Sequence, residues 1–336
     1  MLKLRHTLPL IIMSLLQFSV FSQDIHWSQF NHNPIFQNPA NAGHFNGDYR
    51  FYGNYRDQWR SVTVPFSTFA LSADSRIPKY QDIGYAINFF HDVVGDGQFR
   101  TIEFQGSASY NLKLTSDSTH NLRLGLNLGL NHRQFNIDQL NFDNQFDGIS
   151  YNPSLSSGET FQTDRKSNLS TGVGATYMYY SNKRLNFTGG VGVFNLNRPN
   201  QGFLGDKIRR EIRTEIFING IYKLNYDLDL VPGIKSSIQG KYREFMMGSS
   251  VKYTLVDRLG EYRAVYAGIW FRNRDAGVIS VGADYQSWFA GLSYDINFSS
   301  LVPASNARGG IEIAVRYIMF RFKPKKNTHR ICPDYI

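Results

Sequence analysis

The sequence predicts a transmembrane antiparallel β-barrel of about 14 strands in the bacterial outer membrane. Long stretches alternate between apolar and polar residues, as in residues 121–135, where leucine occupies every second position from Leu122 to Leu130. Side chains on a strand point to opposite faces at period 2, and about 9–11 tilted residues cross the hydrocarbon core. Aromatic residues make up 15% of the chain, yet mean hydropathy is only −0.35. This combination is typical of barrels, whose alternate strand residues meet lipid and whose aromatic residues gather at two interfaces.

The first 22 residues are predicted to be a secretory signal peptide. Lys3 and Arg5 precede an apolar run that begins at Leu8, and Ser22 suits cleavage before Gln23. A short apolar core behind a basic start is typical of exported proteins and too short for a conventional spanning helix. A buried N-terminal helix is the alternative interpretation. The mature protein is therefore expected outside the cytoplasm.

Residues 23–47 are expected to form an N-terminal periplasmic arm or partial plug. The segment is rich in Asn, His and aromatic residues, and its Pro34 and Pro39 do not suit central strands, because proline cannot donate to the ladder. At the other end, residues 323–336 are expected to form a C-terminal periplasmic tail. Lys323, Lys325 and Arg330 make this tail basic, which favours a solvated tail over a docking peptide.

Alternation and turn residues predict the barrel over residues 48–322. The expected strands are residues 48–59, 66–77, 82–91, 98–114, 121–135, 168–180, 185–196, 210–225, 228–242, 245–256, 262–273, 277–286, 288–298 and 310–322. An even number lets an antiparallel barrel close with both chain ends on one side, and closure leaves no unpaired edge in lipid. With the N-terminus periplasmic, the long links 136–165, 197–207 and 299–309 face outward. Glycines on the inner parity are expected to let an arm or loop approach the wall closely.

No enzyme chemistry is expected from the sequence. The eight histidines are scattered, no Cys/His cluster has the spacing of metal ligands, and no cofactor is indicated. Asp92 and Asp96 hint at a calcium site, but turn chemistry explains them better. The single cysteine, Cys332, cannot form an internal disulfide. The chain is thus not expected to be an enzyme.

The formal net charge of +9 favours anionic lipid headgroups or acidic partners. Nucleic acid is not expected as a partner, because the Lys and Arg residues are spread over strand ends and the lumen rather than concentrated on one recognition helix.

Both ends of the chain resemble the PorP/SprF family of outer-membrane barrels, which belong to the type IX secretion and gliding machinery. The N-terminal resemblance lies in QFNHNPIFQNPANAG at residues 29–43 and continues in NYRDQW at residues 54–59. The C-terminal resemblance lies in GLSYDIN at residues 291–297, in residues 309–312 and in the pair Cys332 and Pro333. In the middle of the chain, the resemblance to the family lies in the regular succession of strands more than in the residues themselves.

The resemblance implies a secretion component without enzymatic activity. Such proteins support export or surface attachment of large adhesins that carry type IX C-terminal signals, by scaffolding or docking. The implied partners are outer-membrane lipid, other secretion components, the adhesin C-terminal domains, and a periplasmic lipoprotein or peptidoglycan-binding OmpA-like protein. Strand number alone leaves a second hypothesis open, a FadL-like or porin-like channel for small or hydrophobic solutes.

The motif residues are the candidate site. They are expected either to lock the arm into the lumen, which is favoured, or to contact a partner directly. For Cys332 a free thiol is the default, with acylation or pairing with another chain as alternatives. The full set comprises Asn38, Pro39, Ala40, Gly43, Arg56, Gln58, Trp59, Asp295, Cys332 and Pro333.

Overall fold

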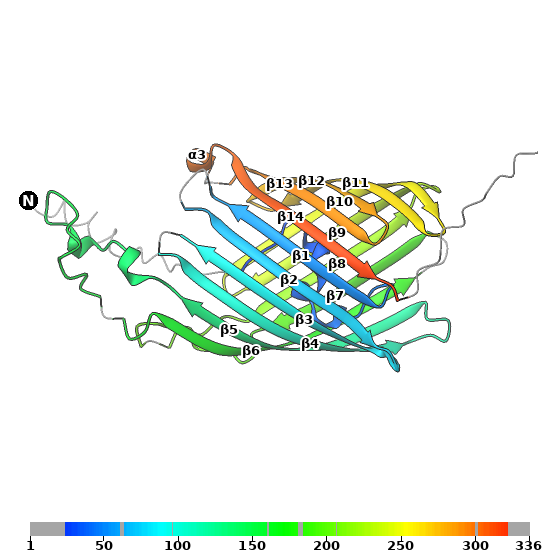
Figure 1. The fold of residues 1–336 in the computed structure, drawn as a ribbon, viewed down its shortest axis with the longest axis horizontal. Coiled ribbons are helices and arrows are strands. Elements are labelled where there is room, and N and C mark those ends of the chain that lie inside the picture. Colours follow the sequence, from blue (N-terminus) through cyan, green and yellow to red (C-terminus); the bar gives the residue numbers. More distant parts are fainter. Residues whose placement is uncertain are drawn as a thin grey trace, which may run out of the picture.

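The computed structural model describes residues 24–60, 64–95, 97–159, 161–180, 184–205, 207–299 and 302–321. Within them, fourteen antiparallel strands form one closed barrel in which each strand pairs with its neighbours in sequence (Figure 1). The last strand returns to pair with the first, from Tyr49↔Met319 to Asp57↔Ile311. Closure gives every strand two partners, so no edge is left to be satisfied by lipid. The expected closed antiparallel barrel of fourteen strands is confirmed.

The strands are regular and long. They are β1 Tyr49–Gln58, β2 Phe66–Ile77, β3 Tyr80–Val94, β4 Phe99–Lys113, β5 His120–Gln134, β6 Arg165–Tyr180, β7 Leu185–Phe194, β8 Arg213–Lys223, β9 Leu228–Gln239, β10 Tyr242–Arg258, β11 Glu261–Arg272, β12 Ala276–Tyr285, β13 Trp288–Asn297 and β14 Arg308–Met319. None of the helices among the described residues is long and apolar enough to span a membrane.

Period-2 alternation produces two distinct surfaces. On β5, Leu126 and Leu128 are 65% and 59% exposed on the outside, whereas Asn127 between them is 6% exposed. A soluble protein would bury such a leucine row, because burial removes apolar surface from water. The outer surface is therefore the lipid-facing one, and the inner surface carries the polar and charged side chains.

Some strand boundaries differ from the prediction. β3 and β10 extend beyond the expected residues 82–91 and 245–256, and β8 is shorter than the expected residues 210–225. Apolar alternation marks only the part of a strand that meets lipid. The hydrogen-bond ladder continues past that part and includes polar side chains, as the pairing Asp92↔Thr101 near the β3–β4 connection illustrates.

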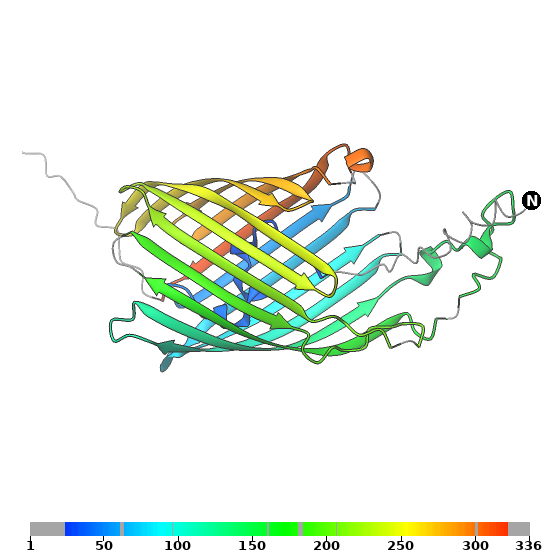
Figure 2. The same ribbon diagram turned by 180° about the vertical axis from the view of Figure 1, so that it is seen from behind.

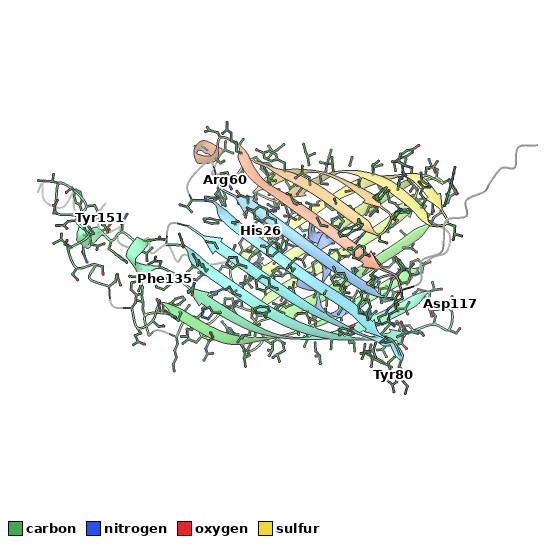
Figure 3. All side chains as sticks on the ribbon, viewed as in Figure 1. His26, Arg60, Tyr80, Asp117, Phe135 and Tyr151 are labelled. Carbon is green, nitrogen blue, oxygen red and sulfur yellow. The ribbon has the colours of Figure 1, made fainter. Side chains whose placement is uncertain are left out.

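The two ends of the barrel differ, as expected from the lengths of the links. One end, the loop end, carries the long connections 135–164, 195–212 and 298–307; the first holds two 3-10 turns, η3 Ile137–Gln139 and η4 Asp143–Gln145, and the last holds helix α3 Val302–Ser305. The other end, the turn end, has short connections such as 78–79 and 286–287. Arg60, Phe135 and Tyr151 lie toward the loop end in Figure 3, and Tyr80 and Asp117 lie at the turn end.

Candidate functional site

Residues 24–47, here called the arm, lie inside the barrel (Figure 2). Three short helical turns make up its centre: η1 Phe30–His32, α2 Pro34–Gln37 and η2 Pro39–Asn41. These turns contact β3, β4, β5, β6, β8 and β14, strands from opposite sides of the wall. Each proline stands at the first position of its turn, where its missing N–H and fixed φ are no disadvantage. The arm runs from the loop half of the lumen, at Asp24, to the turn end, where β1 begins.

Aromatic side chains pack the arm against the wall. Phe30 meets the Trp270 ring edge-on at a centroid distance of 5.4 Å, and His32 stacks on Phe289 at 4.0 Å. Trp27 and Phe30 are each only 2% exposed. The apolar core of the protein therefore lies within the lumen, between the arm and the inner face of the strands.

Asn38, Pro39 and Ala40 dock on β5 and β6. The Asn38 side chain caps η2 by accepting from the Ala40 N–H at 2.9 Å, and it donates to the Ala175 carbonyl oxygen at 2.9 Å. Asparagine is a preferred N-cap because its oxygen satisfies a free N–H of the first turn. Asn38 and Ala40 are fully buried. This part of the family motif thus faces the barrel wall and not solvent.

Glycines on the inner face make this close approach possible. A Cβ at Gly125 would lie 2.5 Å from the Ala40 Cα, and one at Gly174 would lie 2.9 Å from the Pro39 Cδ. Gly84 is similarly placed, since its Cβ would lie 2.8 Å from the Ala42 carbonyl carbon. The expectation that inner-face glycines admit an arm is confirmed at these positions.

Gly43 ends the docked segment near the turn end. Its φ is +69°, in the left-handed region that favours glycine, and its N–H donates to Asp74 Oδ2 at 2.7 Å. Asp74 is held by Arg50 through two hydrogen bonds of 2.9 and 2.8 Å. The same guanidinium donates to the carbonyl oxygens of Asn41 and His44. One buried arginine–carboxylate pair therefore fixes the exit of the arm into β1.

Arg56 lies at the centre of a second buried ion cluster, on the loop half of the barrel. It contacts Glu312 of β14 at 2.8 Å and Asp295 of β13 at 2.7 Å. Both carboxylates also bind the arm. The Ser28 hydroxyl donates to Asp295 at 2.8 Å, and the backbone N–H groups of Ser28 and Gln29 donate to Glu312 at 2.7 and 2.8 Å.

Arg272 of β11 completes this cluster. It lies 3.0 Å from Asp295 and donates to the Ser28 hydroxyl, as Arg56 also does. Charged groups removed from water need partners of opposite charge, and here two guanidinium groups and two carboxylates form ion pairs with one another. We name Ser28, Arg56, Arg272, Asp295 and Glu312 the lock cluster. Arg56 and Asp295, predicted from distant motifs, therefore meet in space.

Asp24 holds the other end of the arm. Its carboxylate accepts from Arg210 at 2.9 Å and lies 3.8 and 4.0 Å from Arg213 and Arg133. Its backbone N–H donates to Gln239 Oε1 at 2.8 Å. Burial opposes ionisation of Asp24, but Arg210, Arg213 and Arg133 outweigh it and hold the pKa of its carboxyl below the usual range.

Gln58 and Trp59 line a cavity of about 910 Å³ toward the loop end, which the arm bounds with residues such as Asp24 and His26. They are not part of the lock cluster. Cys332, Pro333, the predicted leader and the predicted tail lie outside the described residues. The motifs therefore divide into residues that bind the arm directly and residues that line the cavity beyond it.

Sequence reasoning missed several of the contacts. Ser28, Asp24, Arg50 and Arg272 were not among the expected site residues, and Glu312 appeared only inside a matched stretch. A usable pattern was present, because Glu312 stands between Ile311 and Ile313 and so belongs to the inner parity of its strand. A charged residue on the inner face of a closed barrel requires a buried partner.

The three arm histidines are held neutral. Burial lowers the pKa of the His26 imidazole to about 3; Glu244 opposes this shift, while Arg272 and Arg56 add to it. Burial likewise lowers the pKa of His32 to about 3, with a contribution from Arg316, and that of His44 to about 3, with a contribution from Arg50. A docked arm therefore cannot accept protons that a released arm binds near the ordinary histidine pKa of about 6.5.

Acidification is expected to loosen the arm as the pH falls from 6.5 toward 3. Since the released arm takes up protons that the docked arm refuses, docking free energy is complete above pH 6.5 and is lost progressively below it. For His26 alone the loss at pH 5 is about 2 kcal/mol. Asp24 adds a further loss below about pH 4, because its carboxylate is favoured when docked. Limited proteolysis of the arm in purified barrel across this pH range measures the effect.

The control for this prediction is a barrel with His26→Gln, His32→Gln and His44→Gln together. Its arm should show a much flatter response between pH 6.5 and pH 4. Equal protease resistance of the wild-type arm at pH 8 and pH 4 would contradict the assignment of neutral, buried histidines.

Comparison with known proteins agrees with this architecture. The family model described as type IX secretion system membrane protein PorP/SprF matches residues 19–317. No curated protein matches the chain. One similar solved structure is a FadL homologue from Pseudomonas aeruginosa, with a TM-score of 0.50 and 13% sequence identity; the match covers 85% of this chain and 94% of that one. Another is the Ralstonia pickettii toluene transporter TbuX, with a TM-score of 0.50 and 8% sequence identity; the match covers 86% of this chain and 94% of that one. At these identities the likeness shows the fold alone.

Proposed function

Because the chain belongs to the PorP/SprF family of type IX secretion system membrane proteins, we propose that this outer-membrane barrel supports secretion or surface attachment of large adhesin-like cargo with type IX C-terminal signals. It acts as a scaffold or docking site. The loop end faces the cell exterior and presents the cargo surface. The partners on the periplasmic side are a lipoprotein or a peptidoglycan-binding OmpA-like protein.

The observation that carries a scaffold role is the occupied lumen. The arm is anchored at three places, by Asp24 with Arg210, by the lock cluster and by Asp74 with Gly43. A barrel filled by its own buried segment is suited to presenting rigid loops at its end. It is poorly suited to free diffusion of solutes through its centre.

Locking the arm is the role we propose for the motif residues Asn38, Pro39, Ala40, Gly43, Arg56 and Asp295. Support comes from their burial and from their contacts within the lumen, which leave little surface for a second protein. Gln58 and Trp59 differ, because they line the cavity at the loop end. They are the motif residues best placed for a partner or ligand.

Deleting the gene is expected to abolish surface display of the adhesin cargo while leaving general growth intact. The reason is that a scaffold serves one export route and not the supply of nutrients. Surface labelling of adhesins and mass spectrometry of the culture medium measure the outcome. Re-expression of the wild-type chain should restore display, and undiminished adhesin display in the deletion strain would contradict the proposal.

A second candidate function is a channel for small or hydrophobic solutes. The cavity favours it, since aromatic side chains such as Phe90, Phe99 and Phe194 line a space of about 910 Å³. The fold is also similar to those of a FadL homologue and a toluene transporter. Uptake of a small aromatic hydrocarbon by cells with and without the gene distinguishes the two functions, because only a channel predicts slower uptake in the deletion strain.

A further inference from the structure

The cavity at the loop end is large enough for a ligand of drug size. Its volume of about 910 Å³ lies within the roughly 300–1,000 Å³ of typical ligand pockets. The arm closes one side through residues 24–26 and Phe36, and the ends of strands from both halves of the barrel close the others. Its walls are formed mainly by the strands and the docked arm, with Asn195 and Arg210 from the connection 195–212 and no described residue of the connection 135–164.

The cavity wall is apolar and aromatic in part. Trp59 lines it together with Phe36, Phe66, Phe90, Phe99 and Phe194. The Arg213 guanidinium is sandwiched between the rings of Phe36 and Phe194, with its central carbon 4.2 and 4.4 Å from their centroids. Such stacking fixes a cation in place without neutralising its charge. The surface therefore suits an apolar body that also carries an anionic group.

Among the described residues that line the cavity, six arginines face five carboxylates. Arg210 binds both Asp24 and Glu103, at 2.9 and 3.3 Å. Lys235, which faces the lumen from β9 but does not line the cavity, binds Glu244 at 2.9 Å, and Arg272 binds Asp275 at 2.9 Å. The fifth, Asp92, accepts from the Thr68 hydroxyl at 2.9 Å. Arg272 and Arg213 also contact Asp295 and Glu215, at 3.0 and 3.8 Å, so carboxylates outside the lining balance these two arginines as well.

Arg133 has the weakest charge pairing of the four lining arginines that are not exposed; the other two, Arg243 and Arg274, are exposed to solvent. Its closest carboxylate oxygen is that of Asp24, at 4.0 Å, and Asp24 is already bound by Arg210. One of its terminal nitrogens donates to the neutral amide of Gln201, and its Nε has no hydrogen-bond partner among the described residues. The guanidinium lies 5.9 Å from the centroid of Phe99, and the side chain is 11% exposed. It is a nearly buried cation beside an aromatic wall.

We propose that this cavity binds a singly charged carboxylate carried on an apolar body, with Arg133 holding the carboxylate. The planar guanidinium matches a carboxylate through paired hydrogen bonds, and one weakly paired guanidinium suits a monoanion better than a dianion. The aromatic rings cover the apolar body. A free aromatic or aliphatic acid and the C-terminal end of a peptide offer the same chemistry; the peptide case rests on the cargo-docking function proposed above.

Titration of detergent-solubilised barrel with matched pairs of probes tests this proposal. One pair is 3-phenylpropanoate and its amide; the other is a short peptide ending in phenylalanine with a free or an amidated C-terminus. At least one carboxylate probe is expected to bind at least tenfold more tightly than its own amide, because the amide keeps the shape and loses the charge. Equal affinity of acid and amide in both pairs, or no binding of any probe, would overturn the proposal.

Variants assign the charge recognition to Arg133. Arg133→Gln is expected to lose the tenfold preference for the acid, whereas Arg133→Lys should keep part of it. Arg258→Gln is the matched control, since this exposed arginine lies at the turn end of β10. Protease resistance of the arm shows that each variant is folded. A preference that survives in Arg133→Gln would contradict the assignment.

The two probe pairs separate the sources of the carboxylate. A preference in the small-acid pair alone identifies a free acid as the ligand, and one in the peptide pair identifies a chain end. Binding is measured on purified protein and adhesin display on cells. If no probe binds, the ligand site is refuted and the secretion role is unaffected. If adhesin display is normal in the deletion strain, the secretion role is refuted and the ligand site is unaffected.

Discussion

Replacing Arg56 by glutamine is expected to release the N-terminal segment of the arm and to destabilise the barrel by about 3–5 kcal/mol. Arg56 is 1% exposed, and it contacts Glu312 and Asp295 at 2.8 and 2.7 Å. Without the guanidinium, Glu312 keeps only the backbone N–H groups of Ser28 and Gln29 as hydrogen-bond donors among its described contacts. An uncompensated charge in a buried site is expensive, so the arm should leave and water should enter.

Urea unfolding of purified barrel and limited proteolysis of the arm measure this effect together. Arg60→Gln is the control, because the Arg60 side chain is 73% exposed at the loop end, where its pair with Asp57 is screened by water, and its loss should change neither quantity. The double variant Arg56→Gln with Glu312→Gln should recover part of the loss, since the unpaired carboxylate is gone. Wild-type stability and an intact, protected arm in Arg56→Gln would show that the lock cluster does not hold the arm.

A side chain at Gly125 is expected to expel the arm from the lumen. In Gly125→Val, the new Cβ would lie 2.5 Å from the Ala40 Cα and from the Pro39 carbonyl carbon, both backbone atoms. Backbone of a capped, fully buried turn cannot move aside as the end of a flexible side chain can. The strand itself should tolerate valine, because β-branched residues suit a half-buried sheet surface. The barrel is therefore expected to fold with its centre open.

Gly106→Val is the matched control for this prediction. Gly106 lies on the lipid-facing parity of β4, and its Cβ would have no neighbour nearer than the Leu128 carbonyl oxygen at 4.0 Å. Protease sensitivity of the arm should rise strongly in Gly125→Val and stay at the wild-type level in Gly106→Val. Equal protection of the arm in both variants would mean that docking of the arm does not depend on the space left by the missing side chain at Gly125.

The barrel could be predicted from sequence because each strand carries its own evidence. On β5 and β13 the alternation is nearly perfect, so lipid and lumen faces follow from the residues alone. Boundaries were less accurate where strands run beyond the lipid, as in β3, because polar ends of strands resemble loops in composition.

The path of the arm could not be predicted in the same way. Its helical turns span only three or four residues, too few for any periodic pattern, and only Pro34 and Pro39 mark where two of them begin. The partners of Arg56 lie 239 and 256 positions away along the chain. Such pairs form only because closure brings β1 beside β14 and near β13, so their geometry is a property of the whole barrel.

The polar start of the arm was also misleading. Asp24, Ser28 and Gln29 look like a solvated segment when read as sequence, although Ser28 and Gln29 are buried and Asp24 binds three arginines. Their burial follows from the inner surface of the barrel, which presents charges that only a polar insert can satisfy. The family motif located part of this site, and the charged inner parity of β8, β11 and β14 supplies the rest.

Planar-bilayer recording of the purified wild-type barrel tests most directly whether residues 24–47 close the lumen. The occupied lumen predicts a silent wild-type protein and steady conductance steps in Gly125→Val, with Gly106→Val silent like the wild type. A stable open conductance in the wild-type protein, equal to that of Gly125→Val, would contradict a locked arm and favour the channel function.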